Sequence, residues 1–154
     1  MTARALIVGA LLVATLPAAA EAPRARDLGI PFEGTPGPLN AITDVAGVTV
    51  GHETIVADLP DGRAARTGVT AVLPRGRNSM HAQVFAGWTA LNGNGEMTGT
   101  TWLSESGFLE GPVMITNTHS VGAVHEGTIR WRVAQDGADA TGYFWSLPVV
   151  AEAW

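Results

Sequence analysis

The residues best suited to ligand chemistry lie in a glycine-rich segment, Leu91–Gly99. Glu96 stands there between Gly95 and Met97, and the glycines allow the backbone to approach a ligand closely. A carboxylate in such a segment can bind an ammonium group or act as a general base. The alternative is an exposed turn glutamate, which the spacing alone favours. Glu96 is a candidate that needs support from a second feature.

Asn117 is a second candidate, because it follows the apolar run Val113–Thr116. Its amide could donate hydrogen bonds to an oxyanion, but an Asn at this position can also cap a helix or satisfy a turn. The Asn117–Thr118 bond also has the form that an N-to-O acyl shift opens, leaving a threonine that uses its own amine as base. The spacing favours capping, and cleavage at this bond is the weakest of the three interpretations.

Several other kinds of site lack support. Cysteine and lysine are absent, which removes cysteine nucleophiles, cysteine-ligated metals and a lysine Schiff base from this stretch. No HExxH or HxH spacing occurs among the histidines, so we expect no metal site; they are His52, His81, His119 and His125. No GxSxG elbow is present, although a Ser-His-Asp triad assembles in space and therefore stays open.

Composition predicts a folded domain without a nucleic-acid partner. Apolar residues make up 46% of the chain and charged residues 15%, which suits a globular core. The net charge of −5 provides no basic surface for phosphates.

The first twenty residues are typical of a secretory signal peptide. Arg4 supplies a positive charge, Ala5–Pro17 forms an apolar stretch, and the small residues 18–20 precede Glu21. The apolar stretch is short for the alternative, an N-terminal membrane anchor. We therefore expect residues 1–20 to be a signal peptide and the mature protein to be periplasmic or secreted, with no membrane partner.

The elements that must position these candidates begin after residue 40. Residues 21–40 are rich in proline and glycine and predict an extended arm. Alternation predicts strands at 48–56 and 68–73, the second stopped by Pro74 and Gly76, and residues 58–66 predict the loop of a hairpin between them.

Further strands are expected at residues 82–91, 113–116 and 143–154, and a helix at 121–133 with Thr118 or Ser120 as its cap. Segment 82–91 has apolar residues on both faces, which indicates a sheet covered on both sides. The chain stops at Trp154 within a strand pattern. We therefore expect residues 41–154 to be the N-terminal part of a truncated domain.

Several motifs, taken together and in order from Arg26 to Trp154, resemble one family: the self-processing aminopeptidases that include L-aminopeptidase/D-amidase-esterase and the β-peptidyl aminopeptidases. The motifs are Arg-Asp-Leu-Gly-Ile (26–30), Gly-Pro-Leu-Asn-Ala-Ile-Thr-Asp-Val (37–45), Gly-Val-Thr-Val-Gly-His (47–52), Gly-Val-Thr-Ala-Val (68–72), Gly-Asn-Gly-Glu (93–96) and Thr-Asn-Thr (116–118). The combination is specific, whereas no single motif would be.

The resemblance implies an α+β fold, a four-layer αββα sandwich similar to the N-terminal-nucleophile hydrolases, of which this chain supplies the N-terminal part. It implies an N-terminal serine nucleophile located after Trp154, so that the fragment alone is inactive, and no metal or organic cofactor. It implies that Glu96 receives the free amine of a small peptide, amide or ester, with Asn94 and Thr98 beside it and Asn117 in support. Further partners implied are the C-terminal chain of the same precursor and other copies in a homo-oligomer.

Two other functions remain open on the sequence. An acyltransferase of the ornithine acetyltransferase type is also self-processing, but its nucleophile is threonine and its location cytoplasmic, which the signal peptide opposes. A secreted non-catalytic binding module would instead require a complete fold within 154 residues.

Overall fold

A computed structural model describes residues 22–77, 79, 81–136 and 144–153. The chain divides into two units, residues 1–35 and 36–154. In the first unit the described residues form turns without helix or strand, and the Arg26 guanidinium donates to the carbonyls of Phe32 and Glu33. The expected signal peptide, residues 1–20, lies outside the described residues, and the division at residue 35 falls within the expected arm at 21–40.

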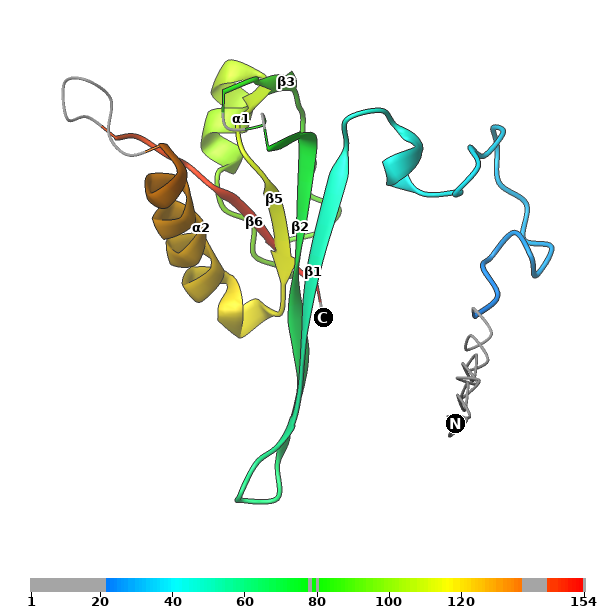
Figure 1. Ribbon diagram of the computed structural model, residues 1–154, viewed down its shortest axis with the longest axis horizontal. Helices are drawn as coiled ribbons and strands as arrows, with labels where there is room; N and C mark the ends of the chain where they lie inside the picture. The colour runs from blue at the N-terminus through cyan, green and yellow to red at the C-terminus, as the bar shows by residue number, and fades with distance from the viewer. Residues whose placement is uncertain (1–21, 78, 80, 137–143, 154) are drawn as a thin grey trace, which may run out of the picture. The chain divides into compact units, whose positions relative to one another are not determined.

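The second unit is built on a four-stranded sheet with the order β1-β2-β5-β6 (Figure 1). β1 and β2 are antiparallel, as are β2 and β5, whereas β5 and β6 are parallel. The strands of this sheet are β1 (Thr49–Asp58), β2 (Ala64–Arg77), β5 (Val113–Thr116) and β6 (Val149–Glu152). A separate two-stranded sheet joins β3 (Val84–Phe85) to β4 (Phe108–Leu109). The helices are η1 (Ile42–Asp44), α1 (Thr100–Ser106), η3 (Thr118–Ser120) and α2 (Val121–Asp136).

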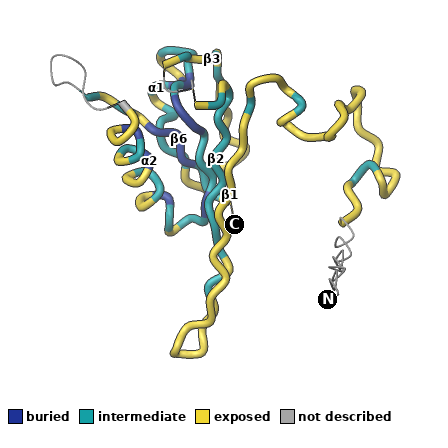
Figure 2. Tube along the Cα trace, in the orientation of Figure 1, coloured by how far each residue is buried: buried dark blue, intermediate teal, exposed yellow. Residues whose placement is uncertain are grey.

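The β1–β2 hairpin confirms the predicted pair of strands and their loop. Its turn is closed by a hydrogen bond from the Leu59 N–H to the Arg63 carbonyl, 2.8 Å long. A hydrogen bond from the Arg63 side chain holds the pKa of the exposed residue Asp61 below its usual value. Every residue of β1 is exposed, and Figure 2 shows this exposure continuing around the tip of the hairpin.

β2 is longer than predicted, because it continues through Pro74 and Gly76 to Arg77. Pairing with β1 ends at Leu73, and pairing with β5 ends at Val72. The missing N–H of Pro74 therefore removes no hydrogen bond from either ladder, and proline is tolerated there.

α2 connects the parallel strands β5 and β6 and packs against both of them. A parallel pair requires such a crossover, and here the helix lies along one face of the sheet (Figure 1). Val121 at the start of α2 and Val150 in β6 are buried, the latter completely. The predicted helix at 121–133 is thus confirmed and extends to Asp136.

Two predicted elements are wrong in extent, and one helix was not predicted. The strand expected over 82–91 shrinks to β3, because only Val84 and Phe85 find partners, on β4. The strand expected over 143–154 shrinks to β6, and residues 144–148 before it are irregular. α1 spans only seven residues between Gly99 and Gly107, both with positive φ, and is too short for a clear helical periodicity.

The described residues therefore form an α+β fold with a mixed sheet and a helix covering one of its faces. A small core gathers Leu103, Leu109 and Val149, with Met97 packed against it. No helix among the described residues is both long and apolar enough to cross a membrane.

Candidate functional site

The glycine-rich segment that carries Glu96 runs along the free edge of β6. Met97 forms an isolated antiparallel bridge with Ala151, and the Glu152 N–H donates to the Glu96 carbonyl at 3.0 Å. The Thr98 N–H donates to the Val150 carbonyl, also at 3.0 Å. Backbone bonds to a buried strand thus fix the position of Glu96.

The Thr98 hydroxyl forms two hydrogen bonds that attach this segment to the β6 region. It donates to the Pro148 carbonyl at 2.7 Å and accepts from the Val150 N–H at 3.0 Å. Both contacts hold the segment onto β6 and its approach. Thr98 does not line the hollow described next, and any direct contact of Thr98 with substrate stays a prediction.

An open hollow of about 690 Å³ lies beside this segment. It is lined by Gly93, Asn94, Gly95, Glu96, Thr118 and Glu152. The Glu96 side chain belongs to an exposed residue and can meet a ligand from solvent. Two carboxylates and no basic residue line the hollow, so its charge suits a cationic group. Asn94 shares the hollow with Glu96, as expected, and its N–H donates to Asn92 Oδ1 at 2.8 Å.

Thr118 and Glu152 are the lining residues that sequence reasoning did not assign to the site. They meet because β5 and β6 are parallel and end together, with Thr116 opposite Glu152. The carboxyl ends of neighbouring parallel strands are a common place for ligand-binding side chains. A signal was present in the sequence, since Glu152 is the only charged residue in the apolar run 149–153.

Asn117 is held by structural hydrogen bonds. Its Oδ1 accepts from the Ser120 N–H at 3.1 Å and so caps the short helix η3. Its Nδ2 donates to Thr67 Oγ1 at 2.6 Å and to Ser120 Oγ at 2.9 Å. These bonds agree with the capping interpretation and use the donors that an oxyanion would need. An oxyanion role for Asn117 stays a prediction.

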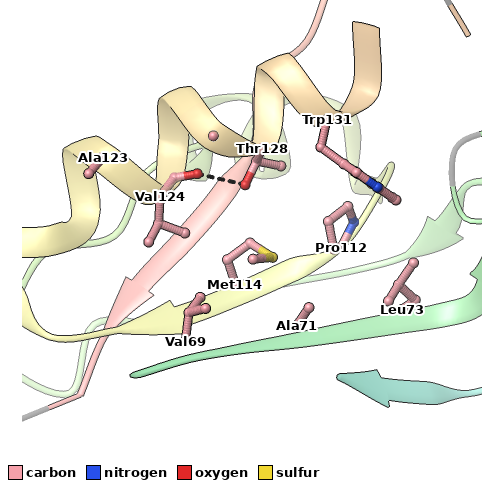
Figure 3. A pocket seen from close by; sticks show the side chains of 10 residues that line it. Val69, Ala71, Leu73, Pro112, Met114, Ala123, Val124, Thr128 and Trp131 are labelled. Atoms are coloured by element: carbon pink, nitrogen blue, oxygen red, sulfur yellow. Dashed lines mark hydrogen bonds between the residues drawn. The ribbon is translucent and has the colours of Figure 1, made fainter. Parts of the chain in front are cut away.

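A second cavity, of about 440 Å³, lies between α2 and the sheet (Figure 3). Its walls are almost wholly apolar, with Met114 and Val69 on the strands and Val124 and Trp131 on the helix. The Thr128 hydroxyl there donates to the Val124 carbonyl of its own helix at 2.7 Å. The cavity offers no titratable group for chemistry, so the hollow at Glu96 is the better candidate site.

The histidines, all of which lie among the described residues, form no metal cluster there. His52 on β1 contacts Thr70 Oγ1 at 2.6 Å and Thr54 Oγ1 at 2.9 Å. The described residues contain no group of three or more His, Cys, Asp or Glu side chains able to hold a metal ion.

The described residues thus combine an α+β fold with a carboxylate-lined hollow at the ends of parallel strands, and comparison with known proteins shows the family. The sequence profile of peptidase family S58 matches residues 40–154. The chain belongs to this family.

Two curated relatives are named β-peptidyl aminopeptidase BapA. The protein from Sphingosinicella microcystinivorans is 52% identical over 97% of this chain, and that from Sphingosinicella xenopeptidilytica is 47% identical over 96%. The matches cover 37% and 36% of the relatives, so this chain spans little more than a third of their length.

Solved structures agree with this assignment. The L-aminopeptidase D-Ala-esterase/amidase of Ochrobactrum anthropi, described as a variant of the Ntn hydrolase fold, matches with a TM-score of 0.75 at 50% identity. The match covers 86% of this chain and 38% of that one. A Burkholderia β-aminopeptidase also matches with a TM-score of 0.75, at 45% identity, over 85% of this chain and 36% of its own. The expected fold class is confirmed, and this chain matches 38% and 36% of the two solved chains.

Proposed function

We propose that this chain is the N-terminal portion of a self-processing serine aminopeptidase that removes N-terminal residues from small peptides, amides or esters. The observation that carries the proposal is the exposed carboxylate of Glu96, fixed by backbone bonds at the edge of an open acidic hollow. Family membership and the relatives' names, which specify aminopeptidase activity, support it.

In this proposal, Glu96 binds the ammonium group of the substrate. The opposite charges attract, and the carboxylate accepts hydrogen bonds from the ammonium, which fixes the first residue of the substrate in the hollow. Asn94 lies beside Glu96 and adds polar contacts. A substrate whose amine is acylated carries no charge there and would bind poorly.

The bond-breaking groups belong to sequence after Trp154. A serine at the new N-terminus of the C-terminal chain attacks the carbonyl, and its own α-amine takes the proton. The acyl-enzyme is then hydrolysed by water, with no metal or organic cofactor. The chain alone is accordingly inactive and needs the C-terminal chain of its precursor.

The same proposal includes the cellular setting. Residues 1–20 act as a signal peptide that exports the protein to the periplasm or the medium, and the processed enzyme forms a homo-oligomer. The apolar stretch that follows Arg4 supports export.

The test uses the full-length precursor with Glu96→Gln and alanine p-nitroanilide as substrate. Glutamine keeps the shape of the side chain and removes its charge, so KM should rise at least about tenfold, the effect of losing a charged hydrogen bond. Glu105→Gln, at an exposed position on α1, is the matched control and should leave KM unchanged. Unchanged kinetics in Glu96→Gln would remove the assigned role.

A further inference from the structure

A further hollow, of about 420 Å³, lies where the β1–β2 hairpin continues beyond the end of β5 (Figure 1). β5 ends at Thr116, whereas the two strands of the hairpin remain paired as far as Asp58. No carboxylate is among the described residues that line this hollow. We call it the threonine-lined hollow, after its lining residues Thr54, Thr67, Thr70 and Thr116.

The threonine-lined hollow adjoins the acidic hollow at Glu96 through two pairs of consecutive residues. Asn117 lines the first and Thr118 the second, and Ala153 and Glu152 are divided in the same way. In the proposed function the acidic hollow binds the amine of the substrate, and in an α-amino acid a single carbon separates this amine from the carbonyl that is attacked. The nucleophile must therefore reach the carbonyl from a space next to the acidic hollow, and the threonine-lined hollow is such a space.

Uncharged hydrogen-bond acceptors line this space. Thr67 Oγ1 accepts one hydrogen bond, from Asn117 Nδ2 at 2.6 Å, and a hydroxyl oxygen has a second lone pair. His52 contacts Thr70 Oγ1 at 2.6 Å and Thr54 Oγ1 at 2.9 Å. A neutral imidazole accepts at one nitrogen and donates from the other, so acceptor capacity also remains on these two hydroxyls. The hollow suits a guest that brings N–H donors.

The charges around the hollow favour a neutral amine over an ammonium. The charged or titratable lining residues are His52 on β1 and Arg66 on β2, and the lining residues from β5 onward carry no charge. The Arg66 guanidinium bonds Asp58 at 2.7 Å, so the charges of this pair compensate each other. The carboxylates of Glu96 and Glu152 belong to the lining of the acidic hollow. Since no carboxylate lines the threonine-lined hollow, an amine gains little there by becoming protonated.

We propose that the threonine-lined hollow holds the new N-terminal serine of the C-terminal chain, and that Thr67 is a positioning residue whose hydroxyl oxygen accepts from an N–H of the neutral α-amine. This inference rests on the proposed aminopeptidase function. The bond to Thr67 directs the lone pair of the amine towards the serine Oγ. The amine takes the Oγ proton as Oγ bonds to the carbonyl carbon, and gives this proton to the leaving group as the bond to that group breaks.

The experiment uses the full-length, self-processed enzyme with alanine p-nitroanilide, and kcat is expressed per active site titrated with a sulfonyl fluoride. Thr67→Val keeps the shape of the side chain and removes the hydroxyl, so kcat should fall at least about tenfold while KM holds. Thr67→Ser restores the hydroxyl and should keep kcat within about threefold of the parent. Thr49→Val, at an exposed position of β1 outside the hollow, is the matched control and should change neither constant.

The pH profile of kcat tests the surroundings of the amine. Thr54→Glu places a carboxylate in the hollow, which stabilises an ammonium, so the acid limb of kcat should move up by about one pH unit. Thr49→Glu adds the same charge to β1 outside the hollow and should leave this limb in place. A merely structural role of the hollow would not move the limb.

Two kinetic results would overturn the proposal: a kcat in Thr67→Val within about twofold of the parent, or an acid limb that Thr54→Glu leaves unmoved. If a variant is not processed, a crystal structure of the processed parent decides. An α-amine nitrogen within about 3.2 Å of Thr67 Oγ1 supports the proposal, and an α-amine outside the hollow contradicts it.

Failure of this inference can be told apart from failure of the proposed function. A full-length precursor that is not cleaved, or whose shorter product does not begin with serine, contradicts the proposed function, and mass spectrometry of the two chains shows this. An active, processed enzyme whose serine lies outside the threonine-lined hollow contradicts the role of Thr67 alone.

Discussion

The backbone N–H of Glu152 donates to the carbonyl of Glu96 across 3.0 Å, which joins two acidic residues that lie far apart in the chain. One residue ends β6, and the other belongs to a loop whose neighbour Met97 bridges to that strand. Their side chains line one hollow, because the loop follows the strand edge. The hollow is acidic because the pairing of the loop with β6 brings the carboxylates of Glu96 and Glu152 to the same place.

Gly95→Ala in the full-length enzyme should impair substrate binding. The added methyl group would lie 3.3 Å from Glu152 Oε1 and would push the carboxylate or the loop aside. Because small displacements of positioning groups are costly, we expect KM for alanine p-nitroanilide to rise at least about threefold. The matched control is Gly87→Ala, where the new atom has open space and lies outside the lining of the hollow. Equal KM values in the two variants would contradict a close approach of Glu152 to the loop.

Asn117→Asp separates capping from oxyanion stabilisation. Aspartate keeps an oxygen acceptor for the Ser120 N–H but loses the amide donors of Asn117. If capping is the role, kcat should stay within about threefold of the parent, whereas loss of an oxyanion donor costs about a hundredfold or more. Asn117→Ala removes the cap as well and should destabilise the protein by about 1 kcal/mol, measured by denaturant unfolding. A large loss of kcat in Asn117→Asp would favour the oxyanion role.

Arg132→Met should destabilise the protein strongly. The Arg132 side chain is 6% exposed, and it bonds Glu110 at 2.6 Å and Ser146 Oγ at 2.9 Å. Its removal leaves a partly buried carboxylate without a partner, for which about 3 kcal/mol is expected. Arg130→Met removes an exposed pair with Glu126 and should cost well under about 1 kcal/mol. Similar losses of Tm in the two variants would show that burial of Arg132 does not matter.

Part of the fold could be predicted from the sequence because its signals are local. The alternation over 48–56 and the loop residues at 58–66 predict the β1–β2 hairpin, and a short apolar run predicts β5. The strands that were predicted too long fail because strand formation is not decided locally. Segment 82–91 alternates like a strand, but strand formation depends on a partner, and only two of its residues find one.

The substrate-binding roles of the site residues stay predictions, but the structure shows which of these residues lie together. Glu96 could be identified as a candidate from the sequence because it is a lone carboxylate in a glycine-rich segment. Asn94, which was expected beside it, lines the same hollow. The family resemblance predicts that Thr98 lies beside Glu96 at the substrate. In the structure, the Thr98 hydroxyl forms hydrogen bonds with the Pro148 carbonyl and the Val150 N–H. That engagement depends on a strand fifty residues away and leaves no trace in the spacing around Thr98.

The sequence by itself determined the hairpin, the helix α2, the family and the candidacy of Glu96, because these depend on local periodicity, turn residues and short motifs. Only the tertiary structure decided that Glu152 joins Glu96. That contact requires β6 to pair in parallel with β5 and the glycine-rich loop to follow the free edge of β6. Both pairings join residues distant in the chain, and their register is set by packing and hydrogen bonding in three dimensions.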